Sequence, residues 1–416
     1  MRNVGYLNAT YDFSPSIKGN FTGVAWYDMA YDLFDYDTIA ARLARNSDQP
    51  LAFLFNLGKD RDSMGMEVRE LYVDFLFDNL DIRVGRQFVV WGVLEGVRIV
   101  DEVNPVDFRE LIMPDLIDYR IPLWTAKFEY FRGDDTWQLL WIPDLHFHKP
   151  APPGSEWELL QRVPGTTEPD SFTLKNSEIG LRYSTYIWNT DVTLSYFYTW
   201  DDFPTVFRSL LLNQNEADNP KFLATYTRMN MYGGTFSRQV GDMIVKGEGT
   251  YVTGKYFAVI DVDRNRDGFL DNLGEVQSDH IRWGLGLEFN WAGFDIAPGI
   301  TQWIILDYDI AMVQSRFDNS INLFIRKDFA QSGILFEILA IRFVNQRETY
   351  LNPAWTFRLT DHFNVTLGAN FFSGASSQFG VLSNQIGQPT VLDQRSQFVG
   401  NFHDNDRVYI NFKYMF

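Results

Sequence analysis

The chain has 416 residues, of which 45% are hydrophobic and 16% aromatic, with no cysteine and a formal net charge of −18. The hydrophobic content excludes intrinsic disorder. The excess of acids excludes nucleic-acid binding through a basic surface, and the lack of cysteine excludes zinc fingers, thiol catalysis and disulfide scaffolds.

The mean hydropathy of −0.20 is that of a soluble protein, yet 12 Trp, 20 Tyr and 36 Phe are more than an acidic soluble domain hides easily. A membrane β-barrel reconciles the two facts, because it shows lipid only every second residue. The dominant pattern is indeed period two, and in the last strand Val408, Ile410, Phe412, Tyr414 and Phe416 share one face. We count about 17 such segments, near the 9–11 residues that cross a bilayer, at residues 3–13, 18–30, 66–78, 80–91, 124–132, 135–142, 176–187, 190–200, 223–238, 243–256, 278–291, 294–306, 319–330, 333–345, 348–360, 363–374 and 405–416.

The connections alternate between tight turns and long links. The long ones lie at about 31–65, 92–123, 143–174, 201–222, 257–277, 307–317 and 375–404. Short turns on the periplasmic side and long loops outside are typical of outer-membrane proteins. We therefore predict an all-β fold, a single transmembrane antiparallel up-and-down β-barrel over residues 1–416, with about 16–18 strands, located in the bacterial outer membrane.

Bacterial single-chain barrels have even strand numbers, and the first segment here runs downward from the outside if the short turns are periplasmic. The chain also opens directly into a strand, without the regions of a signal peptide. We expect a chain that lacks its leader and one strand of an 18-stranded barrel, with 16 strands as the alternative. Pairing of residues 3–13 with the C-terminal strand would contradict this.

Several motifs lie between Arg69 and Trp141. They span Arg69–Asp74, Asp81–Gln87, Asp101–Glu110 and Arg120–Trp124. This stretch resembles a large, porin-like family of proteobacterial outer-membrane proteins that is catalogued as a domain of unknown function and often encoded near resistance-nodulation-division exporters. The resemblance implies a large outer-membrane barrel, and the neighbouring exporters suggest hydrophobic or lipid-like cargo.

The link at 92–123 carries the densest charges. We expect Asn104 to cap a short helix with Pro105 in its first position, and Asp107 to support its positive end. Such a loop can fold into the lumen and sort solutes by its charges, or the charges can pair with one another and fix the loop to the wall. The candidate constriction residues are Arg98, Asp101, Asp107, Arg109, Glu110, Asp118 and Arg120.

Charges at inward strand positions predict a polar lumen or a salt-bridge network that stiffens the wall. The lumen-facing residues are Arg83, Lys127, Glu129, Arg182, Lys246, Glu248, Arg282 and Glu288. Arg86 falls in phase with the outward residues, so either Gly85 marks a bulge or Arg86 reaches the membrane edge.

The acidic loop within 257–277 places oxygen donors and a glycine at the spacing of a calcium loop. The candidate metal ligands are Asp263, Asn265, Asp267, Phe269 and Asp271. Glu275 comes one position late for the bidentate ligand, so a solvated acidic turn is the alternative.

His146 and His148 form either a metal pair or, as we expect, part of the loop rim beside the Pro-rich link at 143–174. We predict no cofactor apart from Ca²⁺ in the loop 263–275.

No nucleophile–histidine spacing or phosphate loop points to an enzyme, so we predict none. The predicted function is a porin-like channel that passes small solutes or ions through a loop-narrowed polar lumen. The alternatives are a structural barrel plugged by its loops or by a partner in a larger complex, and an exporter or importer of hydrophobic molecules, for which Phe131, Leu140, Leu339 and Ile341 are inward apolar indications. The expected partners are outer-membrane lipid and lipopolysaccharide, the barrel-assembly machinery through the strand ending in Phe416, and a periplasmic or envelope-complex protein, but not nucleic acid.

Overall fold

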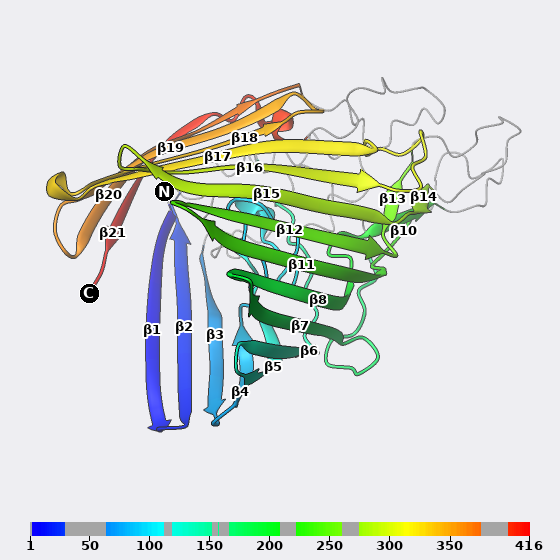
Figure 1. Cartoon of the computed structure of the whole chain (residues 1–416). Coiled ribbons are helices and arrows are strands. Elements are labelled where there is room, and N and C mark those ends of the chain that lie inside the picture. Colours follow the sequence, from blue (N-terminus) through cyan, green and yellow to red (C-terminus); the bar gives the residue numbers. More distant parts are fainter. Residues whose placement is uncertain are drawn as a thin grey trace, which may run out of the picture.

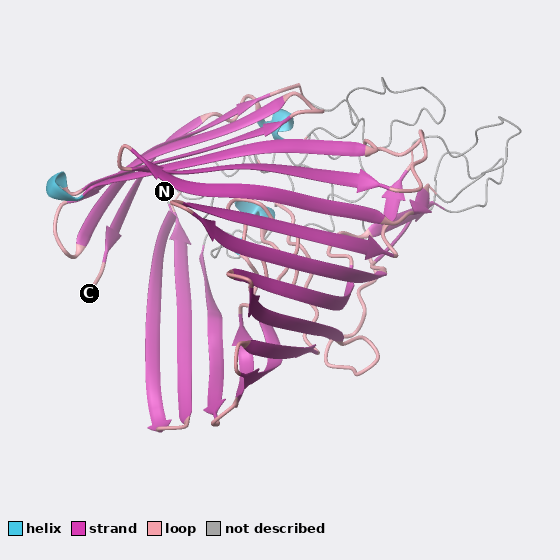
Figure 2. Ribbon diagram, in the orientation of Figure 1, coloured by secondary structure: helices cyan, strands magenta, loops and turns pink. Residues whose placement is uncertain are grey.

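The computed structural model describes residues 2–29, 64–111, 119–151, 157, 166–208, 222–259, 274–375 and 398–416. Within these residues, 17 strands form one antiparallel sheet in which each strand pairs with the next (Figures 1 and 2). The strands of this sheet are β1 (Arg2–Ser14), β2 (Ile17–Asp28), β3 (Met64–Leu76), β4 (Leu80–Gln87), β5 (Leu123–Arg132), β6 (Asp135–Ile142), β7 (Glu178–Ile187), β8 (Thr190–Trp200), β11 (Arg228–Val240), β12 (Met243–Thr253), β15 (His280–Trp291), β16 (Phe294–Ile305), β17 (Phe317–Phe329), β18 (Ile334–Phe343), β19 (Glu348–Arg358), β20 (Phe363–Ser373) and β21 (Arg407–Tyr414).

The alternating pattern therefore predicted the wall correctly, since every predicted segment holds one of these strands. Some boundaries are wrong. The segment 80–91 was predicted too long, because β4 ends at Gln87 and residues 88–91 leave the sheet. The segment 223–238 is not a single strand, because its start forms β10 (Phe222–Thr225), which pairs with β9 (Thr205–Arg208) outside the main sheet. A second short pair, β13 (Tyr256–Ala258) and β14 (Glu275–Gln277), is also separate from the wall.

The sheet has two edges. Strand β1 pairs with β2 and strand β21 pairs with β20, while no pairing among the described strands joins β1 to β21. A pairing of β1 with β21 would have contradicted an additional strand, and the described wall does not contain it. The strand number of the barrel therefore stays a prediction. Within the described ranges, three short 3-10 helices accompany the sheet, η2 (Phe108–Glu110), η3 (Ala330–Ser332) and η5 (Val399–Phe402). None of the described helices is long and apolar enough to cross a membrane.

The two faces of the sheet differ as the alternation requires. On β15, the side chains of Leu285 and Leu287 are exposed on the outer face, whereas Arg282 and Glu288 point to the inner face and make ion pairs there. Outward apolar residues with inward polar ones are the arrangement of a wall between lipid and water.

The inner face is more apolar at its loop-bearing end than the sequence predicted. Three clusters of buried hydrophobic side chains lie there, where segments between strands pack against the wall. The largest joins Leu140 and Ile142 of β6 with Phe197 of β8 and Val252 of β12. Inward apolar residues are therefore concentrated where loops cover them.

Candidate functional site

Between β4 and β5 the structure describes residues 88–111 and 119–122, which lie on the inner side of the sheet, and we call these residues the inward segment. Its side chains Val89, Trp91, Ile99, Val100 and Val103 belong to the same buried cluster as the inner faces of β6, β8, β11 and β12. Figure 1 shows this stretch inside the curve of the wall. Burial of these apolar side chains holds the segment inside.

The inward segment passes strands that are far apart around the sheet. A Cβ atom on Gly180 of β7 would lie 2.8 Å from Trp91, and one on Gly284 of β15 would lie 2.6 Å from Ile99. Farther along, a Cβ on Gly96 would lie 3.6 Å from the Leu339 side chain of β18. These contacts run from β7 to β18, so the segment crosses the interior. Glycine is required on the wall where it passes most closely.

A carboxylate on the wall, that of Glu248, anchors the inward segment where it crosses the interior. The side chain of Glu248, on β12, accepts hydrogen bonds from the backbone N–H groups of Val93, Leu94 (2.6 Å) and Val100 (3.2 Å). Glu102 of the segment pairs with Arg282 of β15 at 3.0 Å. Backbone donors away from water need partners, and a charged acceptor gives the strongest of such bonds.

The predicted constriction charges are largely used within the segment itself. Asp101 and Arg120 form a buried ion pair. Arg98 donates to the backbone oxygens of Asp101 (2.8 Å) and Asn104 (2.7 Å). Asn104 does not cap a helix, contrary to the prediction, because its side chain accepts from Val89 N–H and donates to the carbonyl of Ile121. It closes the base of the segment instead.

The residue that caps η2 is Asp107, whose carboxylate accepts from the backbone N–H of Arg109 at 3.1 Å and pairs with its guanidinium at 2.6 Å. Burial alone would raise the pKa of Asp107, but the hydrogen bonds and charge of Arg109 and the charge of Lys149 hold it below the usual value. Arg109 also lies 5.8 Å from the ring of Trp26 on β2. Glu110 ends η2, and Asp118 lies outside the described residues.

The predicted lumen-facing charges lie on the inner face and pair in short sets. Arg83 pairs with Asp74, Lys127 with Glu129 at 2.5 Å, and Lys246 with Glu288. The remaining member, Arg182, lies 3.4 Å from a carbonyl oxygen of the inward segment. The same residues therefore make the inner face polar and form a salt-bridge network. The two interpretations of the sequence, a polar lumen and a network that stiffens the wall, do not exclude each other.

One chain of hydrogen bonds connects the wall to the inward segment. The indole N–H of Trp91 donates to Gln138 at 2.7 Å, and Gln138 donates to Glu129 at 2.8 Å. Gln138 was not predicted as a site residue.

Arg86 lies outside this chain of hydrogen bonds and pairs with Glu67 on β3 at 2.9 Å. The backbone of the preceding Gly85 has φ +139°, so the departure from the ordinary strand geometry is at that glycine.

The inner face of β16–β20 carries hydroxyl and amide groups at mid-strand, in addition to the ion pairs Arg326–Glu337 and Arg358–Asp328 nearer the tight turns. Hydrogen bonds join Thr301 with Ser320 (2.5 Å) and Asn352 with Asn370 (2.8 Å). This side of the wall therefore offers neutral hydrogen-bonding groups as well as paired charges.

A second anchor was missed in the sequence. Glu348, the first residue of β19, is completely buried and accepts from the backbone N–H groups of Phe398, Val399 and Gly400. It holds η5 to the wall as Glu248 holds the inward segment. In the sequence Glu348 follows only the short link between β18 and β19, so nothing near it indicated its contact with residues 398–400.

His148 connects three segments between strands. Its ring Nδ1 accepts from the Val106 N–H at 2.9 Å, its own backbone N–H donates to the carbonyl of Asp202 at 3.2 Å, and its ring contacts those of Phe108 and Phe203. Burial, followed by the charges of Arg98 and Lys255, lowers its pKa well below the ordinary value. The ring is therefore neutral, as an accepting Nδ1 requires.

The described residues contain no group of three or more potential ligands that could hold a metal ion. His146 lies 3.4 Å from Asp144 and does not share a site with His148. The predicted calcium loop, Asp263 to Asp271, lies outside the described residues, and calcium binding there stays a prediction.

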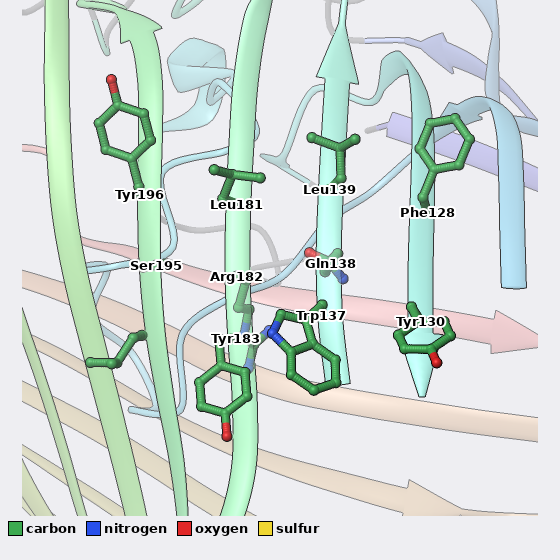
Figure 3. Close-up of a pocket in the computed structure, with 11 residues that line it drawn as sticks. Phe128, Tyr130, Trp137, Gln138, Leu139, Leu181, Arg182, Tyr183, Ser195 and Tyr196 are labelled. Carbon is green, nitrogen blue, oxygen red and sulfur yellow. The ribbon is translucent and has the colours of Figure 1, made fainter. Parts of the chain in front are cut away.

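A hollow of about 530 Å³ lies on the outer face rather than in the lumen. Figure 3 shows its lining side chains standing on neighbouring strands. They include Phe128, Trp137, Leu139, Leu181 and Leu194, which alternate with the inward residues of β5–β8. Most of the lining is therefore apolar and outward, and Gln138, Arg182 and Ser195, at the alternate strand positions, complete it.

Residues 4–156 match the family described as "Protein of unknown function (DUF1302)". The match includes the stretch from Arg69 to Trp141 and confirms the resemblance drawn from its motifs. No curated protein matches the chain.

Solved structures similar to this chain are outer-membrane proteins. OmpT of Vibrio cholerae in its trimer form is 9% identical, with 91% of this chain and 84% of that chain covered and a TM-score of 0.42. OccAB2 of Acinetobacter baumannii is 9% identical, with 90% and 86% covered and a TM-score of 0.47. The outer membrane protein opdK of Pseudomonas aeruginosa is 8% identical, with 90% and 92% covered and a TM-score of 0.46. Similarities this distant carry no information about the solute.

Proposed function

We propose that this protein is an outer-membrane channel that passes small polar solutes or ions through a lumen narrowed by the inward segment, residues 88–111 and 119–122. The observation that carries the proposal is the crossing of the interior from β4 to Leu339 on β18. A segment that runs across a polar tube reduces its open section, and the groups around the remaining opening then decide which solutes pass.

Different parts of the interior fix the inward segment and face the solute. Apolar contacts fix the inward segment against β5, β6, β8, β11 and β12. Toward the tight turns, the inner face carries partly exposed polar pairs such as Arg326–Glu337 and Arg358–Asp328. Such pairs suit water, ions and hydrated solutes better than apolar cargo.

Two observations bear on the alternative functions. Of the four indications of hydrophobic cargo, Leu140, Leu339 and Ile341 pack within or against the buried clusters and so serve packing, whereas Phe131, near the tight turn after β5, is exposed. A plugged structural barrel is favoured instead by the three apolar clusters that join loops to the wall. Planar-bilayer recordings distinguish a channel from a plugged barrel, because only the channel gives current steps.

The absence of cysteine from the chain allows a direct test of the narrowing. A Glu95→Cys variant places one thiol at the tip of the inward segment, and Asp242→Cys places one at an exposed tight turn as a matched control. We expect a bulky neutral thiol reagent to reduce the conductance of the Glu95→Cys channel stepwise and to leave the control unchanged. Equal conductance before and after labelling at both positions would refute narrowing by this segment.

A further inference from the structure

We propose that Glu95 at the tip of the inward segment determines charge selectivity and makes the channel prefer cations. This inference rests on the proposed channel function and names the class of solute. Glu95 was not among the charges singled out in the sequence.

The neighbours of Glu95 place it at the narrowed part of the interior. A Cβ on Gly286 of β15 would lie 2.9 Å from the side chain of Leu94, and Gly96 lies against Leu339 of β18. Glu95 is the residue between these two contacts, and it is exposed. It lines a small hollow beside residues of β12, β15, β16 and β17 on the wall, and it remains exposed there.

The charges around Glu95 are already matched with partners. Lys246, which lines the same small hollow as Glu95, is paired with Glu288. Arg282 is paired with Glu102, and Asn322, the other polar side chain lining the hollow, is neutral. No ion pair joins Glu95 to any described residue, so its negative charge is uncompensated there.

An uncompensated charge at a narrow passage has a larger effect than the same charge at the outer mouth. The apolar side chains of Leu94 and Val97 flank it, and low-dielectric neighbours weaken the screening by water. A fixed negative charge raises the local concentration of cations and repels anions. The net charge of −18 acts in the same direction but is spread along the whole chain.

The test is the reversal potential in planar bilayers under a KCl gradient. For the wild-type protein we expect preference for K⁺ over Cl⁻. We expect Glu95→Gln to reduce the permeability ratio about fivefold, since a unit charge at contact distance in water is worth roughly 1 kcal/mol. Glu95→Lys should move the preference toward Cl⁻. Both effects should shrink at 1 M salt, where the Debye length is about 3 Å.

Asp242→Asn removes the same charge from an exposed turn and should leave the ratio unchanged. Heat-modifiable mobility on a gel shows that each variant is folded. Current steps with the same permeability ratio in the wild type, Glu95→Gln and Glu95→Lys would overturn the role of Glu95 and leave the channel function standing. Folded wild-type protein that gives no current would overturn the channel function, and this inference with it.

Discussion

Glu248 offers the sharpest test of how the inward segment is held. Its carboxylate accepts from three backbone N–H groups, those of Val93, Leu94 and Val100. Glu248→Ala leaves these donors without an acceptor while the rest of the wall strand keeps its ladder. Glu248→Gln keeps the shape and one accepting oxygen, so it should have a weaker effect.

The magnitude follows from the burial of the three donors. The bond from Val100 is buried, and the other two are partly buried, so that water can replace part of what is lost. A buried donor left unsatisfied costs about 1–3 kcal/mol, and a partly buried one less. We therefore expect the anchored state to lose about 3 kcal/mol, which raises the ratio of released to anchored segment about 100-fold.

Single-channel recording reads this change directly, because a released segment alters the open section while current flows. We expect Glu248→Ala to show larger open-channel noise and rapid steps to higher conductance, together with faster proteolysis within residues 88–111. Thr250→Ala is the matched control on the same strand, since Thr250 Oγ1 has no hydrogen-bond partner among the described residues. Noise and proteolysis equal to those of the wild type in Glu248→Ala would refute the anchoring.

Three further predictions concern neighbouring parts of the site. Asp107 and Arg109 form an ion pair at 2.6 Å and so neutralise each other. The reversal potential should therefore show a stronger preference for anions in Asp107→Ala and a stronger preference for cations in Arg109→Ala. Unchanged conductance and selectivity in both variants would exclude this pair from the passage. Burial and neighbouring positive charges lower the pKa of His148, so the folded state resists protonation and loses stability as the pH falls below the ordinary value of about 6.5. The resistance of the wild type to loop proteolysis, relative to His148→Gln, should therefore decline from about pH 7.5 to about pH 5.5, and a constant difference would contradict it. Gly284→Leu should displace the inward segment and cost about 1–3 kcal/mol in thermal unfolding, whereas Gly249→Leu, whose added Cβ would meet nothing nearer than 4.0 Å, should be tolerated.

The strands could be predicted because their signal is local. Inward Arg282 and Glu288 alternate with outward Leu285 and Leu287 within one stretch, and period two needs no knowledge of the rest of the chain. The start of β11 was misplaced because β10 has the same kind of sequence, and its pairing with β9 is a tertiary choice.

The path of the inward segment could not be predicted in this way. The hydrogen bond from Val93 to Glu248 joins residues 155 positions apart, and the contact of Gly96 with Leu339 spans still more of the chain. Nothing in the sequence near residue 95 states which wall strand lies opposite it.

By itself, then, the sequence determined most of the wall. Its outward and inward residues alternate at the two-residue period of a strand, and its tight turns end these alternating stretches. Only the tertiary structure decided which charges stay available in the interior. Asp101 and Arg120 look like exposed loop charges in the sequence but are buried against each other, whereas Glu95 stays exposed. The physical reason is that a charge is compensated by whatever the fold brings within a few ångströms of it, and a strand pattern does not encode that distance.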